Sequence, residues 1–157
     1  MKIEVKIDGI EAAMARLDGL KAIEKRLAPV LKLTAQTIVT TSRANIRAKT
    51  APDGTPYQAL ADSTLRARKA SGQKPPYRPL IWSGNMIRDM FGRALPLGIE
   101  FGAPQHYLVF HQQGSDDNKR PPRRAIFPIT KEGAIETQGS GGQFWNNFRD
   151  KIIKALA

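Results

Sequence analysis

The sequence predicts an α+β fold in which a small antiparallel sheet packs against a long helix and a C-terminal helix, with extended Pro-rich loops. The first basis is the order of the expected elements, β-α-α-β-β-α-β-α, each indicated by the spacing of its apolar residues. The second is that most of the 11 prolines and 13 glycines cluster between these elements. At 157 residues, 41% of them hydrophobic, the chain is expected to form one domain over residues 1–157.

The first elements are predicted to be a strand and two helices. Residues 1–8 alternate charged and apolar side chains, which is the period of a half-buried strand. From residue 10 onward, apolar residues recur every three or four positions, as on a helix with one face toward a core. Pro29 interrupts this pattern. Because proline suits the first turn of a helix better than its interior, we expect a short helix from about residue 10 and a longer one over about 29–48.

The next part of the chain is predicted to contain a turn, a helix and a loop. Residues 52–57 place two prolines around Asp-Gly, a composition typical of a tight turn. A short basic helix is expected from Ser63 or Thr64, as its N-cap, to about Ala70. Residues 71–79 contain three prolines and one glycine, so we expect them to form an exposed, extended loop arm.

The second half is predicted to consist of short elements before a final helix. In chain order these are a hydrophobic anchor with a turn at 80–84, strands at 86–94 and 98–102, a helical turn ending at Gly114, a flexible loop at 115–122, a strand at 125–129 and a flexible hinge at 137–142. Apolar residues at Phe144, Phe148 and Ile152 then indicate an amphipathic helix to the end of the chain.

The composition excludes several classes of site. The chain has no cysteine, which excludes disulfides, thiolate metal sites and cysteine nucleophiles and is typical of a reducing cytoplasm. No apolar run approaches the roughly 18–20 residues that span a bilayer, and the first nine residues do not resemble a signal peptide. We therefore expect a soluble protein that begins at Met1 and has no contact with a membrane.

No set of residues matches a catalytic, metal-binding or cofactor-binding pattern. Residues 139–142 lack the lysine of a phosphate-binding loop and are interpreted as a linker. His106 and His111 lie five positions apart, which turns them about 140° from each other on a helix and disfavours a shared metal. The hydroxyl and carboxylate side chains form no recognisable nucleophile or acid–base pair. The chain is therefore predicted not to be an enzyme and to need no cofactor.

The formal net charge of +11 favours an acidic partner. Residues 43–93 hold ten Lys and Arg against three acids, and residues 119–131 hold five against none. Solubility combined with an acidic protein partner is one interpretation, and contact with DNA or RNA is the other. The sequence has no helix-turn-helix pattern or basic repeat to support sequence-specific recognition of DNA.

The densest basic element is Arg-Pro-Pro-Arg-Arg at 120–124, within an expected basic arm at about 115–124. Its prolines stiffen the chain, so the element can present Arg120, Arg123 and Arg124 to carboxylates or phosphates. A solvated loop, a protein-docking arm and a DNA contact all remain open for this element.

Eight residues are candidates for contacts with a partner. Aromatic residues near loops usually belong to the core, but an exposed one would be an interface anchor, because aromatics and arginine dominate interface hot spots. The candidates are Arg120, Arg123, Arg124, Tyr57, Trp82, His111, Lys74 and Arg78.

Four segments carry a resemblance to a known family. Residues 52–60 contain an Asp-Gly turn, an aromatic and a Leu before a basic helix, and residues 80–86 stand in the place of an Ile-Leu-x-x-(Thr/Ser)-Gly-x-Leu element. Residues 107–114 are like a Tyr-Ala-x-x-His-Gln-x-Gly box, and residues 120–127 form a basic, Pro-containing run that enters an expected strand. In this order the segments resemble the phage virion morphogenesis family, which includes the tail-completion proteins of Mu-like phages. Tyr57 in place of a commoner Trp and Leu108 in place of Ala depart from the pattern.

The resemblance implies a structural role in the virion, in its neck or tail, after assembly in the host cytoplasm. A protein of this family is expected to complete the tail and join it to the filled head as a homo-oligomeric ring, for example a hexamer. The implied partners are other copies of the chain, a tail-tube or tail-terminator protein and a head-completion or connector protein, with non-specific contact to packaged DNA. The alternative from charge alone is a sequence-independent nucleic-acid-binding module.

Overall fold

The computed structural model describes residues 10–114 and 122–157. Its elements are α1 (Ile10–Ala48), α2 (Asp62–Ala70), α3 (Asn85–Asp89), β1 (Phe91–Leu95), β2 (Gly98–Gly102), α4 (Leu108–Gln113) and α5 (Gly139–Leu156). The two strands pair antiparallel. The predicted α+β fold with a long helix, a small antiparallel sheet and a C-terminal helix is confirmed. The strand expected at 1–8 lies outside the described residues.

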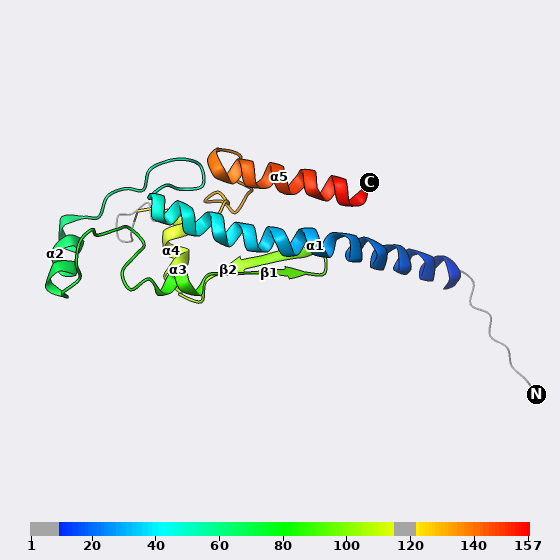
Figure 1. Cartoon of the computed structure of the whole chain (residues 1–157), viewed down its shortest axis with the longest axis horizontal. Helices are drawn as coiled ribbons and strands as arrows, with labels where there is room; N and C mark the ends of the chain where they lie inside the picture. Colours follow the sequence, from blue (N-terminus) through cyan, green and yellow to red (C-terminus); the bar gives the residue numbers. More distant parts are fainter. Residues whose placement is uncertain (1–9, 115–121) are drawn as a thin grey trace, which may run out of the picture.

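Helix α1 is the axis of the molecule. With 39 residues it is about 58 Å long, and its C-terminal half lies between α5 on one side and the β1–β2 hairpin on the other (Figure 1). Leu31, Ala35, Ile38 and Ile46, each at most 2% exposed, form the buried stripe of this half. The core therefore lies along the C-terminal half of α1, between α5 and the β1–β2 hairpin.

The hairpin lies unusually close to α1 because of one glycine. Gly92 on β1 pairs with Phe101 on β2, and it faces the backbone of α1. A Cβ at this position would overlap the carbonyl group of Ala35 and contact Val39. Glycine is therefore required here to let the two backbones approach each other.

Two segments from the second half complete the core. The segment 124–128 is buried throughout, with Ile126 at 0% and Phe127 at 3% exposure. The ring of Phe127 packs on Phe101 of β2 with centroids 5.0 Å apart. From α5, Phe144 joins the same cluster as Ile38 and Ile126. These contacts hold residues far apart in sequence around the C-terminal half of α1.

The prediction that the helix breaks at Pro29 is wrong. Helix α1 is continuous from Ile10 to Ala48 with Pro29 inside it. Proline removes one backbone hydrogen bond and strains a helix without always ending it. The apolar positions Leu20, Leu27 and Leu31 keep the same helical phase across Pro29, so the packing surface is not interrupted.

The predicted start of the strand at 86–94 is too early. Residues 85–89 form helix α3, and the strand begins at Phe91. Met86, Ile87 and Met90 are buried together, a spacing that suits a helical turn, and Gly84 supplies the left-handed backbone (φ +80°) that precedes it. The second strand at 98–102 and the helical turn that ends at Gly114 are confirmed.

Two further expectations are corrected. Residues 125–129 form no strand: the chain bends at 127–128, and Ile129 makes a single bridge to Ile135. Residues 139–142 are not a hinge, because they form the first turn of α5. The small residues there let the helix start pack on the turn at 52–53, where the N–H of Gly141 donates to the carbonyl oxygen of Pro52 at 2.8 Å.

The short basic helix and the proline-rich loop are largely as expected. Helix α2 begins one residue before Ser63, and its N-cap is Ala61 with no side-chain cap. Residues 71–79 contain no helix or strand, which confirms a loop, although Pro79 is buried and Arg78 makes a single bridge to Ile81.

Candidate functional site

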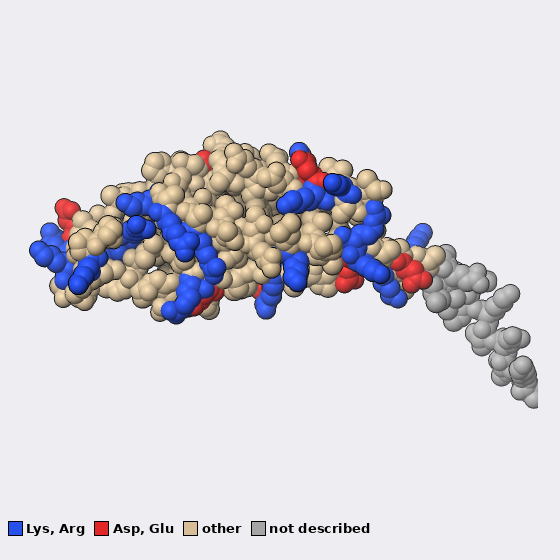
Figure 2. Space-filling model, viewed as in Figure 1, with Lys and Arg blue, Asp and Glu red and all other residues tan. Residues whose placement is uncertain are grey.

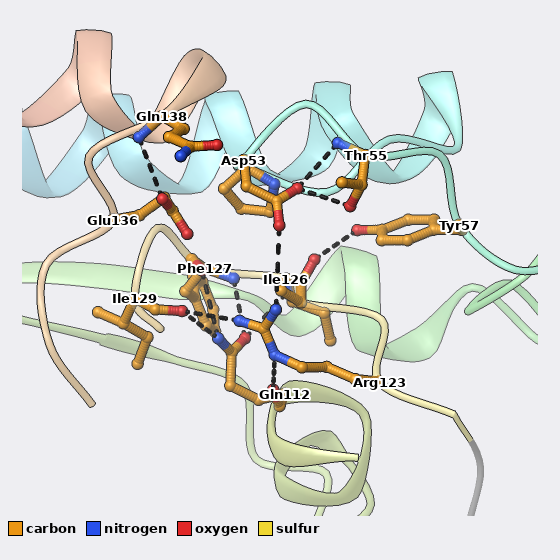
Figure 3. Close-up of polar contacts among 12 residues, drawn as sticks. Asp53, Thr55, Tyr57, Gln112, Arg123, Ile126, Phe127, Ile129, Glu136 and Gln138 are labelled. Atoms are coloured by element: carbon orange, nitrogen blue, oxygen red, sulfur yellow. Dashed lines mark hydrogen bonds and ion pairs between the residues drawn. The ribbon is translucent and has the colours of Figure 1, made fainter. Parts of the chain in front are cut away.

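The side chain of Gln112 on α4 takes the place of a neighbouring strand for the segment 125–129. Its Oε1 accepts hydrogen bonds from the N–H groups of Ile126 and Phe127 at 2.9 and 3.0 Å. Its Nε2 donates to the carbonyl oxygens of Phe127 and Ile129 at 3.3 and 3.0 Å (Figure 3). Gln112 is 7% exposed, so these four bonds form away from water. One amide thus satisfies four backbone groups of this segment that a partner strand would otherwise have to meet.

Arg123 ties this segment to the turn at 51–55. Its Nε donates to the carbonyl oxygen of Gln112 at 3.1 Å, and its Nη2 donates to that of Ile129 at 3.3 Å. Its Nη1 lies 4.0 Å from Oδ2 of Asp53, whose other oxygen accepts hydrogen bonds from the N–H and hydroxyl of Thr55 (Figure 3). Arg123 therefore works as an internal brace between two loops.

A pocket of about 680 Å³ opens beside the network, between α2, α4 and the loops that flank them. Its apolar lining includes Leu80, Trp82, Met86 and Tyr107, and its polar lining includes Arg68, His111, Arg123 and Arg124. No Asp or Glu lines it among the residues that the structure describes. The pocket is therefore positively charged and partly aromatic.

Two arginines of the pocket are buried. Arg124 is 5% exposed, and its Nε and Nη2 donate to the carbonyl oxygens of residues 58 and 59 at 3.1–3.2 Å. Arg68 is 4% exposed, and its Nη1 donates to the carbonyl oxygens of residues 78 and 81 at 3.0 and 2.7 Å. Burial and the neighbouring charge of Arg68 lower the pKa of Arg124, and burial lowers the pKa of Arg68. Both stay protonated, because a guanidinium does not lose its proton in proteins.

His111 lies on α4 at the wall of the pocket. It is half-buried, and the ring of Tyr107 packs edge-on against it with centroids 6.3 Å apart. Burial and the charge of Arg124 lower the pKa of His111 from 6.5 to about 4. The imidazole is therefore neutral at physiological pH.

The depressed pKa of His111 makes stability depend on pH. The unfolded chain binds the proton near pH 6.5 and the folded chain near pH 4, so the contribution is complete above 6.5 and is lost as pH falls toward 4. We expect the free energy of unfolding to fall by up to about 3 kcal/mol between pH 7 and 4 through this group. Urea unfolding of wild type and His111→Gln across this range measures the difference. His106→Gln is the matched control, and an unchanged slope in His111→Gln would contradict the assignment.

The structure brings four of the eight candidate residues to this pocket. They are Trp82, His111, Arg123 and Arg124. Trp82 is 53% exposed at the rim and stays an interface candidate, whereas Tyr57 is a core residue whose hydroxyl donates to the carbonyl oxygen of Ala125 at 2.7 Å. Lys74 is exposed in the loop 71–79 and Arg78 is half-buried there, away from the pocket.

The expectation of a projecting basic arm is wrong for its last two arginines. Arg123 and Arg124 point inward, because their guanidinium groups satisfy buried backbone carbonyls of other segments. Arg120 and the stretch 115–121 lie outside the described residues.

Two buried polar residues of this site were not singled out from the sequence. Gln112 lies within the family motif at 107–114, and nothing in its local sequence indicates that its side chain is buried. Arg68 was one charge among several in a basic helix. Both carry charge or polarity that the sequence alone places on a surface.

A second surface lies on the N-terminal half of α1, which projects beyond α5 and the hairpin (Figure 1). Leu17, Leu20 and Ile23 are 56%, 53% and 37% exposed on this half. At 100° per residue they lie within an arc of about 120°, in line with the buried Leu27 and Leu31. The buried stripe of α1 thus continues as an apolar stripe, here called the α1 stripe, that no other segment within 10–114 or 122–157 covers.

The remaining surface is basic but not continuously so. On the face shown in Figure 2, Lys and Arg side chains form several groups separated by uncharged surface, from the α2 end to the projecting half of α1. Within residues 10–114 and 122–157, no three His, Asp or Glu side chains gather as metal ligands. In that same part of the chain, no helix has the length and apolarity needed to cross a membrane.

Comparison with known families matches residues 6–140 to the phage virion morphogenesis family. Neither curated proteins nor solved structures give a significant match. The matched range includes the pocket, the Gln112 network and the projecting half of α1. It indicates a virion-associated phage protein with a structural rather than an enzymatic role. From this match over most of its length, the chain belongs to the phage virion morphogenesis family.

Proposed function

We propose that the chain completes the phage tail and joins it to the head, as a homo-oligomeric ring in the neck of the virion. The observation that carries this proposal is the α1 stripe. Leu17, Leu20 and Ile23 stand on a helix that projects into solvent, where contiguous exposed apolar side chains mark a protein–protein contact. Family membership supplies the virion context for that contact.

A ring requires that one patch of each copy meet a different patch of its neighbour. The α1 stripe is the first patch. A shallow apolar groove of about 330 Å³ between α1 and α5, which includes Pro29, Val30, Leu33 and Ala155, offers the second. Stripe and groove lie at different positions along α1, so stripe-into-groove contacts would pass from copy to copy, which is the kind of contact that a ring requires.

The charge of +11 suits a neck protein as well. Basic groups on the outside of such a ring would meet acidic surfaces of neighbouring proteins, and basic groups that line its channel would meet the packaged DNA that passes through the neck. Non-specific DNA contact is then a supporting property. Binding to duplex DNA should weaken steeply as salt rises, without preference for sequence.

Deletion of this gene from the phage that encodes it tests the proposal. The expected result is DNA-filled heads and complete-length tails that remain separate, counted by electron microscopy of lysates. Purified chain added to the lysate should restore joined particles, and a heat-unfolded sample of the same chain is the control. Normal numbers of joined, infectious particles without the chain would contradict the proposed role.

A further inference from the structure

The pocket beside α4 holds two buried positive charges that face no carboxylate from residues 10–114 or 122–157. Arg68 and Arg124 are 4% and 5% exposed, and their hydrogen bonds within the described residues go to backbone carbonyl oxygens. The two guanidinium groups are close enough that the charge of Arg68 helps to lower the pKa of Arg124. A buried charge is costly unless it is paired, so two like charges at one pocket indicate a site that lacks its anion.

One donor of this pair is unused. The Nε of Arg68 is buried and has no hydrogen-bond partner among the residues that the structure describes. A guanidinium presents its donors as a planar fork that matches the two oxygens of a carboxylate. An incoming carboxylate would satisfy this donor and offset the repulsion between the two arginines.

The apolar residues that line the pocket indicate that the anion is bound together with an apolar group. The ring of Trp82 lies under the guanidinium of Arg68, with 5.2 Å between the guanidinium carbon and the ring centroid, and is half exposed. Leu80, Met86 and the exposed Tyr107 add apolar surface beside it. The volume of about 680 Å³ holds several side chains. An acidic residue with an apolar neighbour fits these walls better than a bare anion does.

We propose that this pocket binds a short segment of a partner protein, in which an Asp or Glu carboxylate reaches Arg68 and Arg124 while an adjacent apolar side chain packs on Trp82. A protein carboxylate is favoured over DNA because both guanidinium groups lie below the surface. A single side chain reaches them, whereas the phosphates of a stiff duplex stay outside. This inference goes beyond the joining role, which rests on the α1 stripe, and is measured on the chain alone.

A nuclear magnetic resonance titration of the full chain tests the proposal. The probes are acetyl-Leu-Glu-Leu-amide and its Gln analogue, and the readout is the indole N–H of Trp82. Trp145 is the internal reference, because its Nε1 donates to the carbonyl oxygen of Pro128, away from the pocket. The Glu peptide should shift the Trp82 signal to saturation. The affinity for the Gln peptide should be lower by about tenfold or more, because a charge-assisted hydrogen bond is lost.

A matched pair of variants places the effect in the pocket without removing a buried arginine. Thr64 on α2 lines the pocket and is half-buried. Thr64→Glu supplies an internal carboxylate and should weaken the Glu peptide at least tenfold, whereas Thr64→Gln should stay within about threefold of wild type. Thermal unfolding checks that both variants fold.

Three outcomes would overturn the proposal. The first is a Gln peptide that binds as tightly as the Glu peptide. The second is equal binding of the Glu peptide to Thr64→Glu and Thr64→Gln. The third is a Trp82 signal that the Glu peptide does not shift. If inorganic phosphate or a short DNA duplex shifts Trp82 and the Glu peptide does not, the pocket is a phosphate site instead. A negative result in these titrations would not change the result expected from the gene deletion, so the two proposals are tested independently.

Discussion

Replacing Gln112 with leucine should lower the free energy of unfolding by roughly 2–6 kcal/mol. Leucine has a similar size but no amide, so the N–H groups of Ile126 and Phe127 lose their acceptor inside the core. Each buried donor left without a partner costs about 1–3 kcal/mol. The carbonyl oxygens fare better, because that of Phe127 also accepts from the N–H of Ile129 and that of Ile129 from Arg123. The loss is a large fraction of the 5–15 kcal/mol typical of a domain.

Urea unfolding followed by circular dichroism measures this change, with Gln113→Leu as the control. Gln113 is the exposed neighbour on α4, so its replacement should change stability by less than about 0.5 kcal/mol. Amide hydrogen exchange gives a second readout, since the N–H groups of Ile126 and Phe127 should lose protection in the Gln112→Leu variant. A loss below 1 kcal/mol would show that Gln112 does not hold the segment 125–129.

The double replacement Leu17→Lys and Leu20→Lys should abolish self-association and leave the fold of each copy intact. Both leucines are more than half exposed, so neither supports the core of a single copy. Burying each in an interface is worth about 1.5 kcal/mol, and losing both weakens every contact about a hundredfold. The buried lysine charges weaken it further, because an interface core excludes unpaired charge. Native mass spectrometry across a concentration series measures the population of oligomers.

Leu97→Lys is the matched control for this experiment. Leu97 is 64% exposed in the turn between β1 and β2, so the same substitution is made at an equally exposed leucine outside the α1 stripe. The control should assemble as wild type does. Equal assembly of the double variant and wild type would exclude the α1 stripe from the contact between copies.

Apolar spacing in the sequence was enough to predict the main helices but not their ends. The stripe on α1 and that on α5 were both visible, because a helix with one buried face repeats apolar residues every three or four positions. The continuity of α1 was missed because local propensity gave Pro29 more weight than the unbroken phase of the stripe across it. The first turn of α5 was missed for a similar reason, since its glycines are poor helix formers that close packing requires: Gly139 packs on residues 52–53, and Gly141 and Gly142 pack on residues between 128 and 137.

The candidate site was harder to predict because its chemistry depends on contacts distant in sequence. Arg124 and Gln58 are 66 positions apart, and Gln112 bonds a segment 14 to 17 positions away. Charged and amide side chains are usually exposed, so the sequence favoured a projecting arm at 115–124. The structure turns Arg123 and Arg124 inward, where they brace loops and leave a charged pocket. The family motif at 107–114 therefore contains the residue, Gln112, whose side chain holds the buried segment 125–129.

Cryo-electron microscopy of purified virions from the encoding phage tests the central claim most directly. The account predicts a closed ring of identical copies between head and tail, in which the projecting half of α1 from each copy lies on its neighbour. Leu17 and Leu20 should be buried in that contact. Virions that contain no copy of the chain, or copies that do not touch one another, would contradict it.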